Sequence, residues 1–283
     1  MRALNWMMAL AFCALLPLRA GAVQIYLSTT TDATLGGLTF RNGDIARYDT
    51  STGTATLYFS EDAFTFNEDV DAFDLLANGH LLLSTKSVAS LGGLSFQDGD
   101  LVDYDPATGT AVLYFSESLF SNATADVDAA TVLPNGHLVL STQGTETLGG
   151  LTFRDGDLAE YDPVSGFATL FFNENLFAAS EDIDAFDVLP DGSIILSTTN
   201  AASLAGVAFT AGDLVQYFPS SNTASIFFSG SNFTAIANID ATAVFVPEPG
   251  TGLLFLLGLA GLAAYRRNGT LSARAARPAS RES

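Results

Sequence analysis

The sequence repeats one long segment, and this repetition restricts its fold more than any other feature. The segment at residues 182–198 has near copies at 69–85 and 126–142. Its second half alone stands at 25–29, and its first half alone stands at 238–246. A tandem array whose two ends carry complementary halves of one unit is the pattern expected of a chain that closes on itself.

Further landmarks fix a repeat of about 56 residues. Leu-Ser-Thr recurs at 27–29, 83–85, 140–142 and 196–198, and each copy is followed by a Leu-Gly-Gly-like stretch, a Gly-Asp pair and a Tyr. The residue pattern predicts four short strands and no helix in each unit, for example 185–189, 193–197, 158–161 and 168–172. Four antiparallel strands per repeat are typical of a propeller blade.

The halved copies predict how the array ends. An open stack of sheets leaves long edges exposed, whereas a ring leaves one seam. If the inner strand at 241–246 pairs with the strand at 25–29, the two chain ends together complete a fourth blade. We therefore expect an all-β, four-bladed propeller over residues 23–246 in preference to a solenoid.

The charge excludes one class of partner. The chain has 31 acidic and 11 basic residues and a formal net charge of −20. Only Arg41, Arg47, Lys86 and Arg154 are basic between residues 23 and 246. Such a domain is repelled by nucleic acid and by anionic headgroups. An acidic surface that confers solubility and a cation-binding surface both remain compatible with it.

The N-terminal segment has the order of a secretory signal peptide. Residues 1–22 begin with Arg2, continue through an apolar run and end in Ala-Gly-Ala, so the mature chain is expected to start near Val23. Cys13 leaves with the signal, which excludes disulfides and thiol chemistry in the mature chain. A bulky Phe12 before Cys13 argues against a lipoprotein cleavage site.

Aspartates open each inner strand and predict an axial metal site. Inner strands line the channel of a propeller, so we expect Asp71, Asp128, Asp184 and Asp240 to form a ring. Asp69, Asp126, Asp182 and Asn238 lie two residues earlier and are expected to face the same side. Clustered carboxylates raise one another's pKa or bind cations, and oxygen ligands favour Ca²⁺, or Na⁺ with water. The alternative is that these residues only cap turns.

The repeats resemble the hemopexin-type four-bladed repeat. The resemblance rests on the Asp-Ala that opens each inner strand, the Asn-Gly or Asp-Gly turn, and the later Gly-Asp and Tyr-Asp. It implies a four-bladed propeller with an axial cation that adjacent backbone carbonyls help to bind. The aromatic second and third strands of that family are missing, and the units are longer.

After Val246 the sequence resembles a PEP-CTERM sorting signal of Gram-negative bacteria. Pro247, Glu248 and Pro249 precede an apolar stretch at 252–265 and the pair Arg266 and Arg267. The resemblance implies processing by an exosortase-like enzyme and delivery to the cell surface or an exopolysaccharide matrix. The apolar stretch is shorter than the ~20 residues of an ordinary span, so we expect a hydrophobic helix that holds the chain in the inner membrane only until processing. Residues 268–283 are expected to be a basic, disordered tail.

Catalytic signals are sparse. His80 and His137 occupy the same slot after a turn, where the third copy has Ser193, so they are interpreted as structural. The Gly-Asp pairs lack the spacing of a calcium loop and are interpreted as tight turns. The leading hypothesis is a non-enzymatic surface or matrix protein. The alternatives are a polysaccharide hydrolase with acid and base at the channel mouth, and a ligand-binding module.

Overall fold

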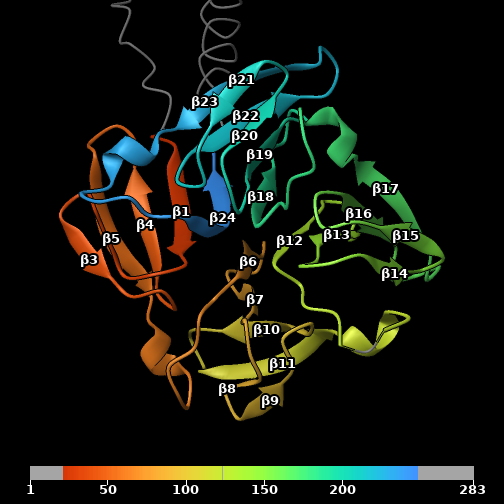
Figure 1. Cartoon of the computed structure of the whole chain (residues 1–283). Coiled ribbons are helices and arrows are strands. Elements are labelled where there is room, and N and C mark those ends of the chain that lie inside the picture. The colour runs from red at the N-terminus through yellow and green to blue at the C-terminus, as the bar shows by residue number, and fades with distance from the viewer. Residues whose placement is uncertain (1–21, 123, 248–283) are drawn as a thin grey trace, which may run out of the picture. The chain divides into compact units, whose positions relative to one another are not determined.

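The computed structural model describes residues 22–122 and 124–247, and residues Val23–Phe245 form one compact unit. Within this unit four antiparallel sheets surround a common axis, with β6, β12, β18 and β24 innermost (Figure 1). Each inner strand contacts the inner strands of both neighbouring sheets. The predicted all-β, four-bladed propeller is confirmed.

Each blade has four strands, in the following order from the axis to the rim. Blade 1 contains β24 (Ile239–Phe245), β1 (Gln24–Thr29), β4 (Ile45–Asp49) and β5 (Thr54–Phe59). Blade 2 contains β6 (Ala72–Leu75), β7 (Leu81–Ser84), β10 (Leu101–Asp105) and β11 (Thr110–Phe115). Blade 3 contains β12 (Ala129–Val132), β13 (Leu138–Ser141), β16 (Leu158–Tyr161) and β17 (Ala168–Phe172). Blade 4 contains β18 (Ala185–Val188), β19 (Ile194–Ser197), β22 (Leu214–Phe218) and β23 (Thr223–Phe228).

The prediction of four strands and no helix per repeat was incomplete. Each repeat also forms a two-stranded hairpin between its second and third blade strands, and a single 3₁₀ turn after its outer strand. The hairpins are β2 (Ala33–Leu35) with β3 (Leu38–Phe40), β8 (Ala89–Leu91) with β9 (Leu94–Phe96), β14 (Glu146–Leu148) with β15 (Leu151–Phe153), and β20 (Ala202–Leu204) with β21 (Val207–Phe209). The 3₁₀ turns are η1 (Glu61–Ala63), η2 (Glu117–Leu119), η3 (Glu174–Leu176) and η4 (Gly230–Asn232).

The Gly-Gly pairs explain the extra hairpins. Gly36 and Gly37 have φ of +54° and +87°, which suits the two central positions of a tight hairpin turn. A side chain at Gly36 would also press against the backbone of Ala55 and Thr54 in β5. The hairpin therefore packs closely on the outer strand of its own blade.

The two chain ends close the ring as predicted. β1 pairs with β24 in antiparallel register from Gln24 opposite Phe245 to Thr29 opposite Ile239. The backbone N–H of Thr30 continues the pairing by donating to the carbonyl of Asn238 at 3.1 Å. The first blade is thus built from both ends of the folded unit.

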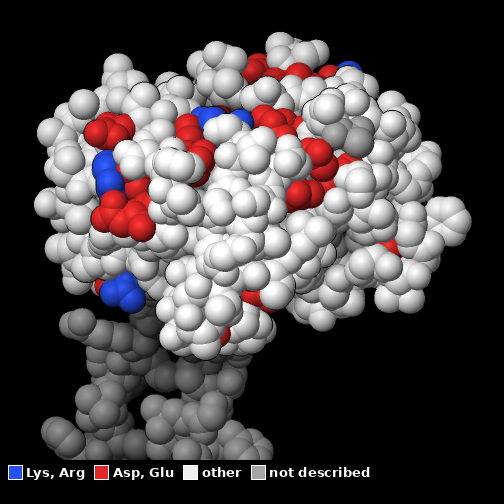
Figure 2. All heavy atoms as spheres, turned by 90° about the horizontal axis from the view of Figure 1, so that it is seen from below, with Lys and Arg blue, Asp and Glu red and all other residues white. Residues whose placement is uncertain are grey.

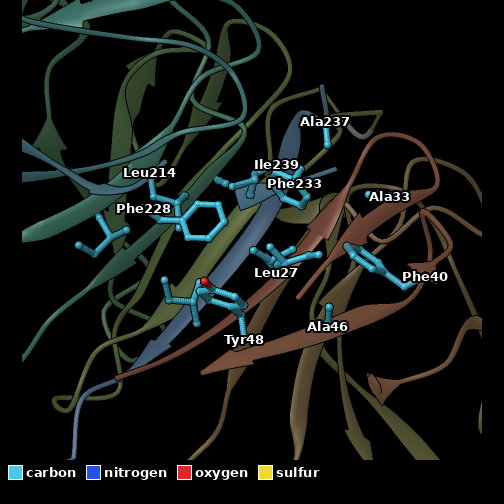
Figure 3. Close-up of a cluster of buried hydrophobic side chains, with 14 of the residues drawn as sticks. Leu27, Ala33, Phe40, Ala46, Tyr48, Leu214, Phe228, Phe233, Ala237 and Ile239 are labelled. Atoms are coloured by element: carbon cyan, nitrogen blue, oxygen red, sulfur yellow. The ribbon is translucent and has the colours of Figure 1, made fainter. Parts of the chain in front are cut away.

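The hydrophobic core lies between blades and is divided into four clusters. Figure 3 shows the cluster between blades 4 and 1, where Leu27 and Tyr48 of blade 1 face Phe228 and Phe233. The ring of Phe228 meets that of Tyr48 edge to face, with centroids 5.5 Å apart. Equivalent aromatic pairs join the other blades, so these phenylalanines form inter-blade core.

Several predicted segments lie outside the described residues. These are the signal peptide, the apolar helix at 252–265, the tail at 268–283 and the sorting residues Glu248, Pro249, Arg266 and Arg267. Across residues 22–122 and 124–247, no helix has the length and hydropathy needed to cross a membrane.

Candidate functional site at the propeller axis

The four aspartates predicted to form a ring do converge on the axis. Asp71, Asp128 and Asp184 stand immediately before their inner strands, and Asp240 is the second residue of β24. Their exposed fractions are 1% for Asp71, 2% for Asp240 and 7% for the other two. The residues on either side of Asp71, Val70 and Ala72, are fully buried in two different inter-blade clusters, whereas Asp71 lines the cavity at the axis.

These carboxylates line one small cavity of about 110 Å³. Its other walls come from the segments that follow each Leu-Ser-Thr and from one residue that precedes an inner strand. The full lining is Thr30, Asp71, Lys86, Asp128, Gln143, Asp182, Asp184, Thr199 and Asp240. The cavity is therefore built from all four blades.

The ring carboxylates are buried but poorly partnered. Both carboxylate oxygens of Asp71 lack a hydrogen-bond partner, as does Oδ1 of Asp128, of Asp184 and of Asp240. A buried carboxylate without a partner is costly, because it loses its hydration and receives nothing in return. A cation or a hydrogen-bond donor placed in this cavity would therefore stabilise the carboxylates.

Burial is the main cause that raises the pKa of every ring carboxyl above its ordinary value, and repulsion between neighbouring aspartates adds to the effect. For Asp240, burial and the nearby Asp69 raise the pKa to about 8, while Lys86 opposes the shift. All four groups therefore share one direction of shift and one leading cause.

Lys86 supplies a positive charge that the sequence analysis did not assign to the site. Its Nζ lies 2.8 Å from Oδ2 of Asp69 and 3.2 Å from Oδ2 of Asp240. Burial lowers the pKa of the Lys86 ammonium, but the two carboxylates more than offset this and raise it. The available signal was its position directly after Leu-Ser-Thr. This position pairs with the residue that opens the same segment, because the Lys86 N–H donates to the Asp69 carbonyl.

Two further carboxyls at the mouth of the cavity also have raised pKa values. Burial and repulsion from Asp98 raise the pKa of Asp126 to about 7. Burial raises the pKa of Asp182 to about 6; a hydrogen bond from Thr199 opposes this shift and Asp155 adds to it. Figure 2 shows acidic atoms at several places on one face of the molecule, with basic atoms beside some of them.

The ring does not form a ready-made chelate. Within the described part of the chain, no three His, Cys, Asp or Glu side chains are grouped closely enough to bind one metal ion directly. An ion in this cavity would keep part of its water shell, which suits Na⁺ or Ca²⁺ better than a metal that needs a closed set of protein ligands. The axial cation remains a prediction.

A second polar group on the inner strands ties blades together. Asp74 accepts the backbone N–H of Val132 at 2.7 Å, and Asp187 accepts that of Val244 at 2.7 Å. The hydroxyl of Thr131 lies 3.1 Å from Asp74 Oδ2 and 3.4 Å from Asp187 Oδ1. These bonds join blade 2 to blade 3 and blade 4 to blade 1, so this group is structural.

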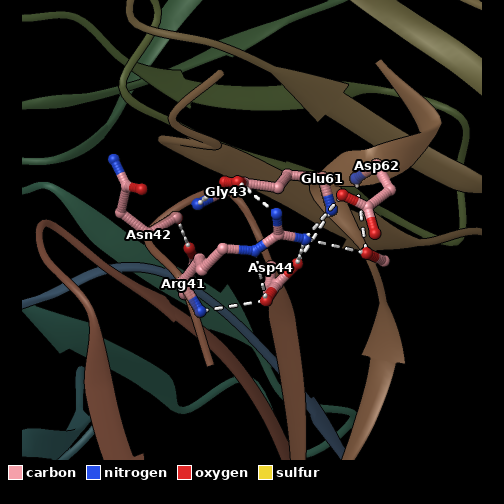
Figure 4. A network of polar contacts seen from close by, with 8 residues as sticks. Arg41, Asn42, Gly43, Asp44, Glu61 and Asp62 are labelled. Atoms are coloured by element: carbon pink, nitrogen blue, oxygen red, sulfur yellow. Dashed lines mark hydrogen bonds and ion pairs between the residues drawn. The ribbon is translucent and has the colours of Figure 1, made fainter. Parts of the chain in front are cut away.

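The Gly-Asp pairs are tight turns, as predicted. Asp44 accepts the backbone N–H of Arg41 at 2.9 Å through Oδ2 and that of Glu61 at 2.8 Å through Oδ1. Arg41 also forms ion pairs with Glu61 and Asp62 (Figure 4). Arg154 repeats this arrangement in blade 3 by pairing with Asp157 and Glu174. The turn aspartate therefore anchors the 3₁₀ turn that leads to the next blade.

The two histidines lie away from the ring and pair with carboxylates on a neighbouring strand. Nδ1 of His80 lies 2.7 Å from Asp103, and Nδ1 of His137 lies 2.7 Å from Glu160. The corresponding place in blade 4 has Gln216 donating to Ser193 at 2.9 Å. Each of these three blades has a polar pair across neighbouring strands at this position, but the residue types of the pair differ. This supports the interpretation of the histidines as structural.

A hollow of about 510 Å³ lies beside blade 4. Gly230 stands where blades 1 to 3 place Glu61, Glu117 and Glu174, and Gly230 and Gly212 both line the hollow. The missing acidic side chain leaves part of this space open.

The fold and the axial cluster define a four-bladed propeller with an acidic axis. Residues 245–267 match the PEP-CTERM protein-sorting motif, which begins at the last residue of β24. The chain is therefore an exported propeller protein with a sorting signal of the kind processed by exosortase-like enzymes, and it is membrane-anchored before processing. A search of curated proteins finds no match.

Solved structures with a similar fold share little sequence with this chain. The extracellular domain of a one-component system from B. thetaiotaomicron is 11% identical with a TM-score of 0.34; the alignment covers 74% of this chain and 33% of that one. A protein of unknown function from Bacteroides caccae is 9% identical with a TM-score of 0.36 and coverages of 80% and 99%. A chain of a nidogen/laminin complex is 8% identical with a TM-score of 0.40 and coverages of 79% and 98%.

Proposed function

We propose that the protein is a non-enzymatic component of the cell surface or exopolysaccharide matrix of a Gram-negative bacterium. The observation that carries the proposal is where the sorting motif begins. β24 ends at Phe245, and its partner β1 begins at Gln24, directly after the predicted signal peptide. Both terminal signals can therefore be removed without taking a strand from the propeller.

The sorting step is tested by replacing Pro247, Glu248 and Pro249 together with alanine in the native host. The variant is expected to keep its C-terminal segment, to have a higher mass than the processed protein, and to accumulate in the membrane fraction. Pro106→Ala, in a turn of blade 2, is the matched control and should be sorted normally. Arrival of the triple-alanine protein in the matrix in wild-type amount would contradict the proposal.

We further propose that the axial cavity holds a hard cation, Ca²⁺ or Na⁺ with water, at Asp71, Asp128, Asp184 and Asp240. The support is the set of buried, unpartnered carboxylate oxygens that line one cavity. Thermal unfolding should shift upward with CaCl₂ and downward with chelator at matched ionic strength, because a ligand that binds only the folded state stabilises it. Identical curves, with no metal in the purified protein, would end the proposal.

The ring also supports a non-enzymatic role over sugar hydrolysis. Acid and base in a glycosidase need two carboxyls in different environments. Asp71, Asp128 and Asp184 share their place in the repeat, their burial and the direction of their pKa shift, and Asp240 differs from them only by its ion pair with Lys86. Release of reducing sugar from the host polysaccharide by the purified protein would favour the hydrolase instead.

A further inference from the structure

We infer that Lys86 is a tethered ammonium that takes one quarter of the axial cavity and thereby sets its affinity for a soluble cation. The inference rests on the proposed axial cation. It deepens that proposal by assigning different roles to the ring aspartates: Asp240 is neutralised from within the chain, whereas Asp71, Asp128 and Asp184 remain to receive the ion.

The contacts of Lys86 place its charge on one side of the ring. Nζ lies between Oδ2 of Asp240, on the closing strand β24, and Oδ2 of Asp69, at 3.2 Å and 2.8 Å. The side chain is 36% exposed while that of Asp240 is 3% exposed, so the ammonium reaches in from the mouth toward a buried carboxylate. Lys86 belongs to blade 2, and this ion pair also holds the closing strand of blade 1.

The other three quarters of the cavity have no such charge. The equivalents of Lys86 in the repeats are Thr30, Gln143 and Thr199, and all three line the same cavity. Thr199 donates a hydrogen bond to Asp182 at 3.0 Å, and Asp182 lies at the mouth of the cavity and is not one of the four ring aspartates. Among the residues that line the cavity, Lys86 is the only basic side chain.

The unpartnered oxygens show where a soluble ion would be attracted. Asp71 has two buried oxygens without a partner, and Asp128 and Asp184 have one each. Asp126 and Asp182 add negative charge near these groups, because, in addition to burial, repulsion from Asp126 raises the pKa of Asp71 and repulsion from Asp182 raises that of Asp128. The Lys86 ammonium therefore offsets part of the negative charge that would attract a soluble cation. Its removal should strengthen cation binding.

The test measures Ca²⁺ binding to the full-length protein by calorimetric titration. Lys86→Met keeps the length of the side chain and removes its charge, and we expect Ca²⁺ to bind about tenfold or more tightly, because a unit charge in a poorly solvated site is removed. Lys86→Arg retains the charge and should stay within about threefold of wild type. Gln143→Met is the matched control at the equivalent position in blade 3 and should also stay within about threefold of wild type.

Lys86→Met leaves Asp240 buried without its partner, so this variant can lose stability when Ca²⁺ is absent. Lys86→Met with Asp240→Asn removes both charges and keeps the other three aspartates. This double variant should bind Ca²⁺ within about threefold of wild type. Binding tenfold weaker than wild type would make Asp240 a principal ligand and would overturn the division of roles.

The outcomes separate this inference from the axial-cation proposal. If wild type binds Ca²⁺ and Lys86→Met binds it no more tightly, the role of Lys86 is wrong and the cation proposal stands. If only Lys86→Met binds, Lys86 fills the site in the native protein, and the soluble cation is wrong. If neither binds Ca²⁺ or Na⁺, both proposals are overturned.

Discussion

At the scale of single residues, Asp187 carries the clearest pH signature away from the proposed cation site. Burial and repulsion from Asp74 raise its pKa to about 7, although backbone N–H groups of Val188 and Val244 oppose the shift. Its pKa in the unfolded chain is about 3.9. The folded state therefore holds the proton more tightly, and the contribution of Asp187 to stability falls as pH rises from about 4 to about 7.

We predict that Asp187→Asn removes this loss. Between pH 5 and 8 the free energy of unfolding of wild type should fall relative to that of the variant by more than about 1.4 kcal/mol, the equivalent of one pKa unit. Urea denaturation at a series of pH values measures the difference. Asp191→Asn is the control: hydrogen bonds from Ser193 lower the pKa of Asp191, so its contribution is lost only below about pH 4, and the difference between wild type and this variant should stay constant from pH 5 to 8. A pH-independent difference for Asp187→Asn would show that its proton is not held by the fold.

At the scale of elements, the turns of the extra hairpins need left-handed backbone. Blade 4 shows a non-glycine residue in that conformation. Gly92 has φ of +58°, and an added Cβ would lie 2.5 Å from the backbone N of Ala111. Ala205 occupies the equivalent place in blade 4 with φ of +49°. The left-handed conformation costs a non-glycine residue about 1–2 kcal/mol, and glycine itself costs about 0.5–1 kcal/mol in chain entropy.

We therefore predict opposite effects for two reciprocal substitutions. Ala205→Gly should raise the free energy of unfolding by about 0.5–1 kcal/mol, the difference between those two costs. Gly92→Ala should lower it by at least about 1–2 kcal/mol, because strain and collision add. The midpoints of denaturant unfolding check both. Destabilisation by Ala205→Gly would mean that the alanine methyl contributes packing that outweighs its strain.

At the scale of the whole molecule, period and symmetry were readable from the sequence. The halved copies at the two ends predicted the pairing of β1 with β24, because only a closed ring gives each half its missing partner. The same symmetry placed Asp71 and its equivalents at the axis. Both predictions depend on what the repeats share.

What sequence reasoning missed depends on what single repeats do differently. Lys86 is charged where its equivalents are uncharged, and its partner Asp240 lies 154 residues away along the sequence. Asp74 and Asp187 bond to backbone of neighbouring blades, a contact that no local pattern encodes. The hairpins were missed for another reason: their strands are three residues long, too short for alternation to be recognised.

The closure of the ring by its two ends is the claim on which the axial cavity depends, and a designed disulfide tests it most directly. Gln24 lies opposite Phe245 in the β1–β24 pair. Gln24→Cys with Phe245→Cys, in a full-length background with Cys13→Ser, should oxidise within one molecule and raise the free energy of unfolding by up to about 5 kcal/mol, because the bond closes a long loop. Gln24→Cys with Leu76→Cys, the equivalent position in blade 2, should stay reduced. Failure of the first pair to form an intramolecular bond in the folded protein would contradict the closed ring.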